Sequence, residues 1–246
     1  MNPKPVYVVS DIHLGAVPAA TERAFRGFLG HVQTHASALL INGDLFDFWF
    51  EYRSVIMREH FRVVARLAEV VEAGVTVTFV GGNHDAWGGS FLRDDVGMQV
   101  VEGPVEMELA GRRTLVAHGD GVGSGDLKYR MLKRVIRSRA SIAGFRALHP
   151  DLGRRIAGAA STTEHKAGSG DVRSKHRADF IQAWGRERLL ADAGLDLVLT
   201  GHAHVPVVEE VAPGRFYANS GDWIRSNSYL VLQPGQSAPE LHTWPV

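Results

Sequence analysis

Cysteine is absent from the 246 residues of this chain. Disulfide bonds and thiolate metal sites are therefore excluded, and a bound metal ion would need nitrogen and oxygen ligands. The sequence also lacks any apolar run near the ~18 residues that a membrane-spanning helix needs. Its first residues contain no apolar segment of the kind found in signal peptides. Together these absences fit a cytoplasmic protein.

Net charge is lacking as well, because 27 Lys and Arg residues balance 27 Asp and Glu residues. A generally basic nucleic-acid-binding protein is therefore disfavoured. Hydrophobic residues make up 45% of the chain and charged residues 22%, which is ordinary for a globular protein. The length predicts one large domain over residues 1–246, with room for an insertion and for a substantial buried core.

The first part of the chain alternates predicted strands with predicted helices. Runs of β-branched and aromatic residues predict strands, and apolar residues at helical spacing predict helices. The predicted strands cover residues 6–9, 38–41 and 75–80, and the predicted helices cover residues 21–35 and 54–74. Ser54 is the expected N-cap of the second helix, and Gly74 is its expected end. Strands that alternate with helices indicate parallel βαβ units.

The pattern changes after the third predicted strand, where several short strands follow one another. These strands are predicted at residues 100–101, 105–109, 113–117, 196–200, 207–211, 216–219 and 229–232. Ala110-Gly111 marks a hairpin turn between two of them. Two sheets packed face to face, with helices outside, would satisfy both halves of the chain. The sequence therefore predicts an α/β (α+β) fold.

A mostly helical insertion is expected over residues 126–193. Its first part is strongly basic, because residues 128–155 contain nine Lys or Arg residues and one acid, Asp151. Apolar residues are interleaved with these charges, so the insertion could accept a lipid and contact an anionic membrane. A plain helical hairpin with solvated charges explains the pattern equally well. Binding of nucleic-acid phosphates is disfavoured, because few aromatic residues are present there to stack on bases.

Five polar clusters follow predicted strands directly. They are Ser10-Asp11-Ile12-His13, Gly43-Asp44, Gly82-Asn83-His84-Asp85, His118-Gly119-Asp120 and Gly201-His202-Ala203-His204. Each cluster alone has a plainer interpretation, such as a turn aspartate, a surface histidine or a satisfied core histidine. Five such clusters, which hold five of the 12 histidines, instead indicate one shared site. The other histidines are interpreted as surface or packing residues: His31, His35, His60, His149, His165, His176 and His242.

The clusters supply seven candidate metal ligands: Asp11, His13, Asp44, Asn83, His118, His202 and His204. Carboxylate, amide and imidazole ligands without sulfur favour Mn²⁺, Fe or Zn²⁺ over an all-oxygen Mg²⁺ or Ca²⁺ site. Seven ligands are too many for one open catalytic ion, and they fit two ions that share the carboxylate of Asp44. Two ions about 3.5–4 Å apart suit in-line attack of water at phosphorus.

The order of the five clusters resembles the calcineurin-like metallophosphoesterase superfamily, and the match runs from residue 10 to residue 204. The resemblance implies a four-layer αββα sandwich and two divalent ions, with Mn²⁺ as the first choice and Fe or Zn²⁺ as alternatives. The resemblance implies that one ion is held by Asp11, His13, Asp44 and either His202 or His204. It implies that the second ion is held by Asp44, Asn83, His118 and the remaining one of these two histidines. The resemblance also implies that His84 protonates the leaving group and that Asp85 orients His84.

Within this superfamily, the segment Gly43-Asp44-Leu45-Phe46-Asp47-Phe48-Trp49 and the insertion resemble the UDP-2,3-diacylglucosamine diphosphatases of lipid A biosynthesis. This resemblance implies hydrolysis of the nucleotide-linked lipid to UMP and 2,3-diacylglucosamine 1-phosphate, with the insertion as a lid. The implied substrate contacts are Asp126, Tyr129, Lys133 or Arg134, Ser174 and Lys175.

One position departs from that family. His84 stands where the best-known members have Arg, and histidine is the general phosphoesterase form. A phosphodiesterase or phosphatase with a soluble nucleotide or nucleic-acid substrate is therefore the alternative function. A non-catalytic, metal-bound scaffold on the same fold is a further alternative, which the presence of His84 disfavours.

Overall fold

The structure is a computed structural model that describes residues 3–87, 89–122, 131, 134–160 and 172–245. One sheet has six strands in the order β11-β10-β1-β2-β3-β4. Their bounds are β1 Val6–Val9, β2 Ala38–Asn42, β3 Thr76–Val80, β4 Gln99–Val101, β10 Ser228–Leu232 and β11 Glu240–Thr243. Strands β1 to β4 are parallel to one another, whereas β10 is antiparallel to both β1 and β11.

The second sheet has five strands in the order β5-β6-β7-β9-β8. Their bounds are β5 Val105–Leu109, β6 Arg112–Val116, β7 Leu197–Thr200, β8 Val207–Ala212 and β9 Arg215–Asn219. Strands β6, β7 and β9 are parallel, and β5 and β8 close the two edges as antiparallel hairpin partners. Each sheet therefore has a parallel centre whose strands all end on one side.

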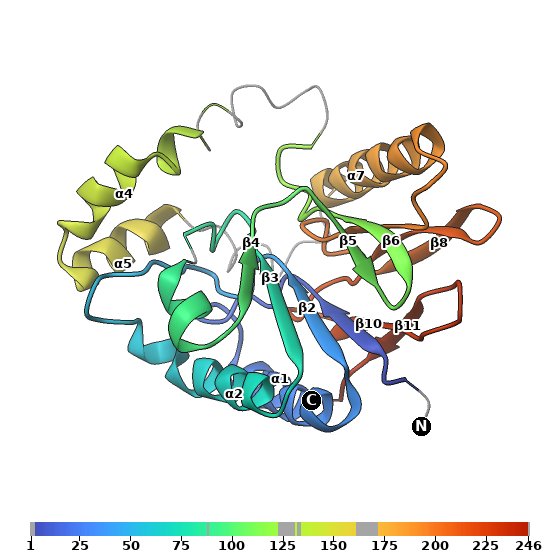
Figure 1. Ribbon diagram of the computed structural model, residues 1–246. Helices are drawn as coiled ribbons and strands as arrows, with labels where there is room; N and C mark the ends of the chain where they lie inside the picture. Colours follow the sequence, from blue (N-terminus) through green and yellow to red (C-terminus); the bar gives the residue numbers. More distant parts are fainter. Residues whose placement is uncertain (1–2, 88, 123–130, 132–133, 161–171, 246) are drawn as a thin grey trace.

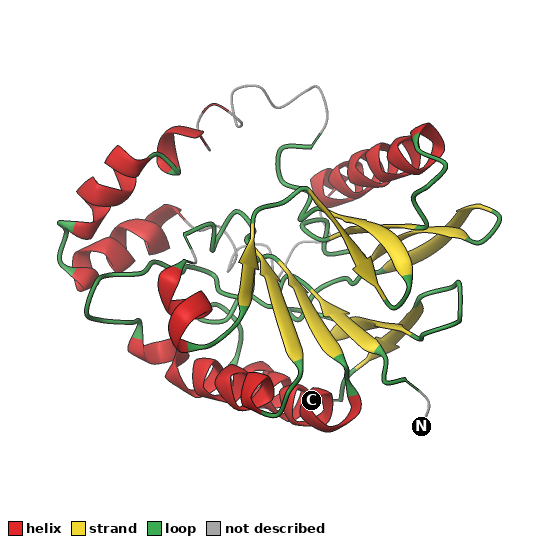
Figure 2. Ribbon diagram, viewed as in Figure 1, coloured by secondary structure: helices red, strands yellow, loops and turns green. Residues whose placement is uncertain are grey.

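The four layers follow from which side chains each strand buries on its two faces. In β1, Val6 and Val8 join the core between the sheets, whereas Tyr7 and Val9 pack with the helices on the outer face. Helices α1 (Ala19–His35) and α2 (Phe61–Glu72) cover the six-stranded sheet, and α7 (Val172–Ala191) covers the five-stranded sheet (Figures 1 and 2). This arrangement confirms the predicted αββα sandwich.

The described part of the insertion contains α4 (Arg139–Arg146) and α5 (Pro150–Ala160) before α7 (Figure 1). Ser138 caps α4, because its Oγ accepts a hydrogen bond from the backbone N–H of Ser141. Within the described ranges, every helix is too short or too polar to cross a bilayer.

The predicted helix start at Ser54 is wrong. The chain makes a short 3-10 turn, η1 (Arg58–His60), and α2 begins only at Phe61. Val55 looks like a member of the apolar helical pattern, but its side chain is 49% exposed, so no burial stabilises a helix there. Two further elements were not predicted from the sequence. One is β11, an edge strand with mostly exposed side chains, and the other is η2, a π-helical turn at Phe91–Asp95.

His60 is a buried packing residue at the start of α2. Its ring lies 4.6 Å from the ring of Phe46 and 6.0 Å from that of Trp49, measured between centroids. Burial lowers the pKa of His60 to about 4, because the charged imidazolium would lose its hydration in this site. The ring is therefore neutral in the folded protein at pH 7.

This lowered pKa predicts a loss of stability in acid. As the pH falls below about 6.5, the unfolded chain takes up a proton at His60 before the folded chain does, so unfolding becomes more favourable. Between pH 7.5 and 5, the folded protein should lose about 2 kcal/mol more stability than the His60→Gln variant. Urea unfolding of both proteins at the two pH values measures this difference. Equal losses would contradict the assignment of acid sensitivity to His60.

Candidate metal centre

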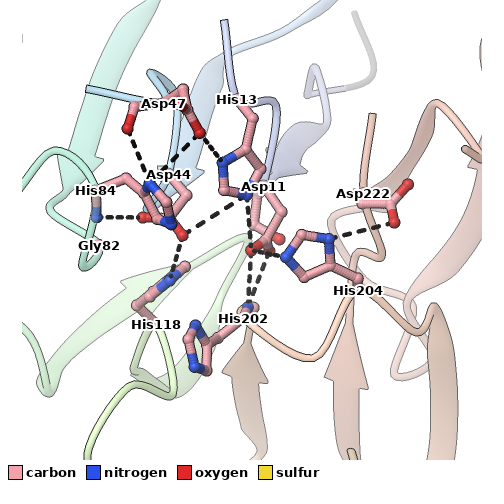
Figure 3. Close-up of polar contacts among 12 residues, drawn as sticks. Asp11, His13, Asp44, Asp47, Gly82, His84, His118, His202, His204 and Asp222 are labelled. Atoms are coloured by element: carbon pink, nitrogen blue, oxygen red, sulfur yellow. Dashed lines mark hydrogen bonds and ion pairs between the residues drawn. The ribbon is translucent and has the colours of Figure 1, made fainter. Parts of the chain in front are cut away.

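The predicted ligands converge at the ends of parallel strands in both sheets (Figure 3). The six-stranded sheet supplies its ligands directly after β1, β2 and β3, and the five-stranded sheet supplies its ligands after β6 and β7. From the first sheet come Asp11, His13, Asp44 and Asn83, and from the second come His118, His202 and His204. The carboxyl ends of parallel strands share one edge of a sheet. Face-to-face packing of the two sheets then brings the two edges together.

Asp44 lies in the middle of this group. Its Oδ2 is 3.2 Å from His118 Nε2 and 3.7 Å from His13 Nε2. Asp44 is only 1% exposed, and its Oδ1 accepts a hydrogen bond from the backbone N–H of His84 at 2.9 Å. The carboxylate thus faces histidines from both sheets.

Among the described residues, three sets of side chains each bring their ligand atoms within 4.8 Å of one another. One set is Asp11, His13 and His204, another is Asp44, His118 and His202, and the third, His13, Asp44 and His84, lies between them. The resemblance left open which late histidine belongs to which set. The structure places His204 beside Asp11, with Nε2 3.3 Å from Oδ1. His202 lies with His118, and their ring centroids are 5.2 Å apart.

The donor atoms of this group fit a divalent metal. Buried polar atoms normally have hydrogen-bond partners, yet His13 Nε2, His118 Nε2 and Asn83 Oδ1 are buried without one. His118 Nδ1 is 2.8 Å from the carbonyl oxygen of Asn42, so Nδ1 donates. In the neutral ring, Nε2 would then turn a lone pair toward the Asp44 carboxylate. Only a cation between these two atoms relieves that repulsion.

The pKa values of Asp44 and His118 show the same attraction of this site for positive charge. Burial favours a neutral Asp44, but the imidazoles of His118 and His13 outweigh it and hold the pKa of Asp44 well below its usual range. Burial favours a neutral His118, but the carboxylate of Asp44 outweighs it and raises the pKa of His118 well above its usual range. A proton on His118 thus takes the place that a metal ion would fill.

The backbone at the ligands is unusual in a way that sequence patterns do not reveal. Left-handed φ angles occur at five candidate ligands: Asp11, His13, Asp44, His202 and His204. Such angles are uncommon outside glycine, and they cluster at functional sites. Gly43 and Gly82 are required here as well, because a Cβ at Gly43 would collide with the His118 ring and one at Gly82 with the Asp44 carboxylate.

A family model for calcineurin-like phosphoesterases matches residues 4–206 of the chain. The chain is a calcineurin-like phosphoesterase. Three curated relatives are named UDP-2,3-diacylglucosamine hydrolase, and each is 30% identical to this chain. The relative from Porphyromonas gingivalis aligns over 92% of this chain and 93% of its own length. The relative from Aeromonas salmonicida aligns over 96% of this chain and 93% of its own length. The relative from Ralstonia nicotianae aligns over 94% of this chain and 90% of its own length.

A solved structure, the nuclease MPE of Pseudomonas putida, aligns over 42% of this chain and 50% of that chain. Its sequence identity of 22% and TM-score of 0.30 are too low to carry an argument. The family match and the hydrolase relatives establish that this calcineurin-like phosphoesterase is a metal-dependent phosphoester hydrolase.

His84 lies beside the candidate ligands of this phosphoesterase, with its ring centroid 4.8 Å from that of His13. Its Nδ1 is 2.8 Å from the main-chain carbonyl oxygen of Asp47, so Nδ1 donates, and 3.5 Å from the Asp47 carboxylate. The side chain predicted to orient His84 was Asp85, whose carboxylate instead accepts backbone N–H groups from Gly82, Asp44 and Phe46. The ring of His84 is therefore held by Asp47, and Asp85 holds the turn that carries Asp44.

Sequence patterns did not identify Asp47 as a partner of His84, and they also did not identify Asp222. It follows β9, and its Oδ2 is 3.4 Å from Nδ1 of His204. A signal was available, because Asn219-Ser220-Gly221-Asp222 is a sixth polar cluster directly after a strand of β-formers. Asp47 also had a signal, since it lies three residues after Asp44. Neither residue could be assigned a partner without knowing which strands lie side by side in each sheet.

The predicted substrate contacts are only partly described. Asp126, Tyr129 and Lys133 lie outside the described residues, as does the side chain of Ser174. Arg134 and Lys175 are exposed. The hydrogen bonds and ion pairs among described residues include none from either side chain to a candidate ligand, so both remain predictions.

A cavity of about 670 Å³ lies between α7 and the five-stranded sheet. Trp184 and Leu195 line the part under α7, and His118, Gly119 and Asp120 also line it. Among the candidate ligands, His118 is the one that borders this cavity.

Proposed function

We propose that this phosphoesterase hydrolyses UDP-2,3-diacylglucosamine to UMP and 2,3-diacylglucosamine 1-phosphate. One observation carries the proposal: relatives named for that substrate are 30% identical over at least nine tenths of both chains. The diphosphate of this substrate contains the phosphoanhydride bond that would be cleaved. Addition of water across one P–O bond then yields the two phosphate products.

We infer that two divalent ions, Mn²⁺ in the first instance and Fe or Zn²⁺ as alternatives, occupy the candidate metal centre. The first position would use Asp11, His13, Asp44 and His204, and the second would use Asp44, Asn83, His118 and His202. Bound ions of this kind activate water and neutralise charge that develops on the transferred phosphoryl group. The unpartnered donor atoms and the central place of Asp44 support this assignment.

His84 would supply the proton that the leaving oxygen needs. Its Nδ1 hydrogen bond to the carbonyl of Asp47 fixes the ring plane and leaves Nε2 as the nitrogen that can reach the substrate. The Asp47 carboxylate also lies 3.5 Å from Nδ1, so Asp47 faces this nitrogen with its side chain as well as its carbonyl. These contacts support His84 as a proton donor held in one orientation.

Within the predicted insertion over residues 126–193, the part that precedes α7 would hold the lipid part of the substrate as a lid, whereas α7 packs on the five-stranded sheet. The described part of this lid is fastened to the metal-site loops by side chains that donate to backbone carbonyls. Arg137 Nη2 donates to the carbonyl of Gly82 at 3.1 Å, and Arg146 Nε donates to that of Glu51 at 3.1 Å. Phe145 packs on Phe50, with ring centroids 4.6 Å apart. In the proposed complex, Arg137 and Arg146 would lie near the diphosphate, and the rings of Phe50 and Phe145 near the acyl chains.

Exposed apolar side chains on the insertion support peripheral contact with an anionic membrane. Met131 is 64% exposed and Val135 is 61% exposed, and the same segment carries the exposed Arg134 and Arg139. Apolar side chains that enter the interface beside basic ones that meet lipid phosphates form a surface of this kind. Such contact would bring the insertion to a substrate that resides in the membrane.

Incubation of the purified protein with Mn²⁺ and UDP-2,3-diacylglucosamine in anionic vesicles should release UMP, which mass spectrometry detects. The protein should also sediment with these vesicles and remain in solution with neutral ones. A chelator added before the substrate should abolish UMP release. Absence of UMP together with turnover of a soluble phosphodiester would favour the alternative substrate class. UMP release without vesicle binding would contradict the proposed membrane contact and support the proposed substrate.

A further inference from the structure

His204 lies between two carboxylates that contact opposite nitrogens of its ring. Nε2 is 3.3 Å from Oδ1 of Asp11, and Nδ1 is 3.4 Å from Oδ2 of Asp222 (Figure 3). Asp11 belongs to the candidate ligand set, and Asp222 lies behind the ring, on the side away from the ligands. A histidine that binds a metal through one nitrogen commonly donates the other N–H to a carboxylate. Asp222 is placed to be that carboxylate.

The carboxylate of Asp222 is held rigidly. The residue is 2% exposed, and its Oδ1 accepts the backbone N–H groups of Arg225 at 2.8 Å and of Ser226 at 3.2 Å. These two bonds fix the carboxylate plane and leave Oδ2 for His204. They also hold the pKa of Asp222 below its usual range, because they and His204 outweigh the effect of burial.

The same turn fixes Asp11 from behind. The backbone N–H of Trp223 donates to the carbonyl of Asp11 at 3.1 Å, and the side-chain hydroxyls of Ser10 and Ser220 are 2.7 Å apart. The Trp223 side chain is fully buried, with its ring 4.9 Å from that of Phe25 between centroids. The turn therefore sets the relative positions of Asp11 and His204.

The two metal positions differ in what stands behind their histidines. In the first position, His204 has Asp222 behind it, and His13 Nδ1 is 3.4 Å from the carboxylate of Asp47. In the second position, Nδ1 of His118 donates to the neutral carbonyl oxygen of Asn42, at 2.8 Å. An anionic partner makes an imidazole a stronger donor to a metal ion than a neutral partner does.

We propose that Asp222, together with Asp47, makes the Asp11–His13–His204 position the tighter of the two metal positions, and that Asp222 acts by holding His204. This inference rests on the two-ion site proposed above. Asp222 is a positioning residue, because it acts through His204 and touches neither the substrate nor the ion. Loss of such a partner weakens metal binding about 10–100-fold.

Titration of the metal-free protein with Mn²⁺, followed by the electron paramagnetic resonance of free Mn²⁺, tests the proposal without an activity assay. The wild type should bind two ions with different dissociation constants. Asp222→Asn should weaken the tighter one about 10–100-fold and leave the weaker one unchanged. Asp94→Asn is the matched control, because Asp94 is an exposed aspartate paired with Arg93. It should change neither constant.

Two further variants separate positioning of His204 from a general structural effect. His204→Ala should remove the tighter ion and His202→Ala the weaker one, a comparison that does not depend on the folding of an Asp222 variant. Asp222→Asn should then add no further loss of Mn²⁺ affinity in the His204→Ala background. An added loss there, equal weakening of both ions, or an unchanged tighter ion would overturn the inference. Binding of only one ion by the wild type would instead contradict the two-ion site.

Discussion

The Asp44→Asn variant is expected to release both metal ions and to lower the rate of hydrolysis at least about 10³-fold. The Asp44 carboxylate lies 3.2 Å from His118 Nε2 and 3.7 Å from His13 Nε2, so this side chain is placed to serve both of the proposed metal positions. Asparagine has nearly the same shape but carries no charge and has a single oxygen. The substitution therefore removes the shared anionic ligand with little change in packing.

The metal content of the purified variant and its steady-state rate measure this effect. The variant should contain less than one ion per chain after dialysis, whereas Asp94→Asn should retain the wild-type content and rate. Circular dichroism of both proteins without metal separates loss of metal from loss of fold. An Asp44→Asn protein that keeps two ions and most of its activity would exclude Asp44 as the shared ligand.

His84→Gln is expected to keep both metal ions and to lose about 10²–10⁴ in rate on a substrate with a poor leaving group. His84 is proposed as the proton donor, and its Nδ1 is already occupied by the carbonyl of Asp47. Glutamine can still form a hydrogen bond, but it cannot transfer a proton at neutral pH. The loss should therefore fall on the chemical step and appear in kcat.

The choice of leaving group gives this prediction its control. A p-nitrophenolate group leaves without protonation, whereas an alkoxide needs a proton to leave, so His84→Gln should slow hydrolysis of a p-nitrophenyl phosphodiester far less than that of an alkyl phosphodiester. A loss of equal size on both substrates would argue against acid catalysis. Loss of a metal ion from His84→Gln would show instead that this histidine, which lies with His13 and Asp44, is a ligand.

Much of the fold was predictable because the decisive signals are local in sequence. The strand at residues 6–9 is a short run of β-branched and aromatic residues, and its predicted bounds agree with β1. Its ligands follow immediately, so one pattern indicated both the strand and the site. Prediction failed where local pattern and burial disagree. Val55 is apolar but exposed, and β11 is a strand although most of its side chains face solvent.

The partners of the ligands could not be predicted, because they depend on which strands lie side by side in each sheet and on contacts between segments far apart in sequence. Asp222 and His204 belong to different strand ends, and the bond between Trp223 and Asp11 spans more than 200 residues of sequence. Left-handed backbone angles at Asp11 and His13 also follow from tertiary contacts, since neither residue type requires them. Sequence patterns thus indicated which side chains meet but not how each one is held.

The position of β1 between strands from the two ends of the chain has a consequence for biogenesis. Val6 pairs with Ala38 of β2 on one side and with Leu232 of β10 on the other, and Trp223 reaches Asp11 from the segment just before β10. A chain emerging from the ribosome can form the β1–β2 pair early. It cannot complete the surroundings of Asp11 and His204 until β10 and the turn before it have been synthesised. Metal acquisition would then follow the joining of β10 to the sheet, well after the β1–β2 pair can form.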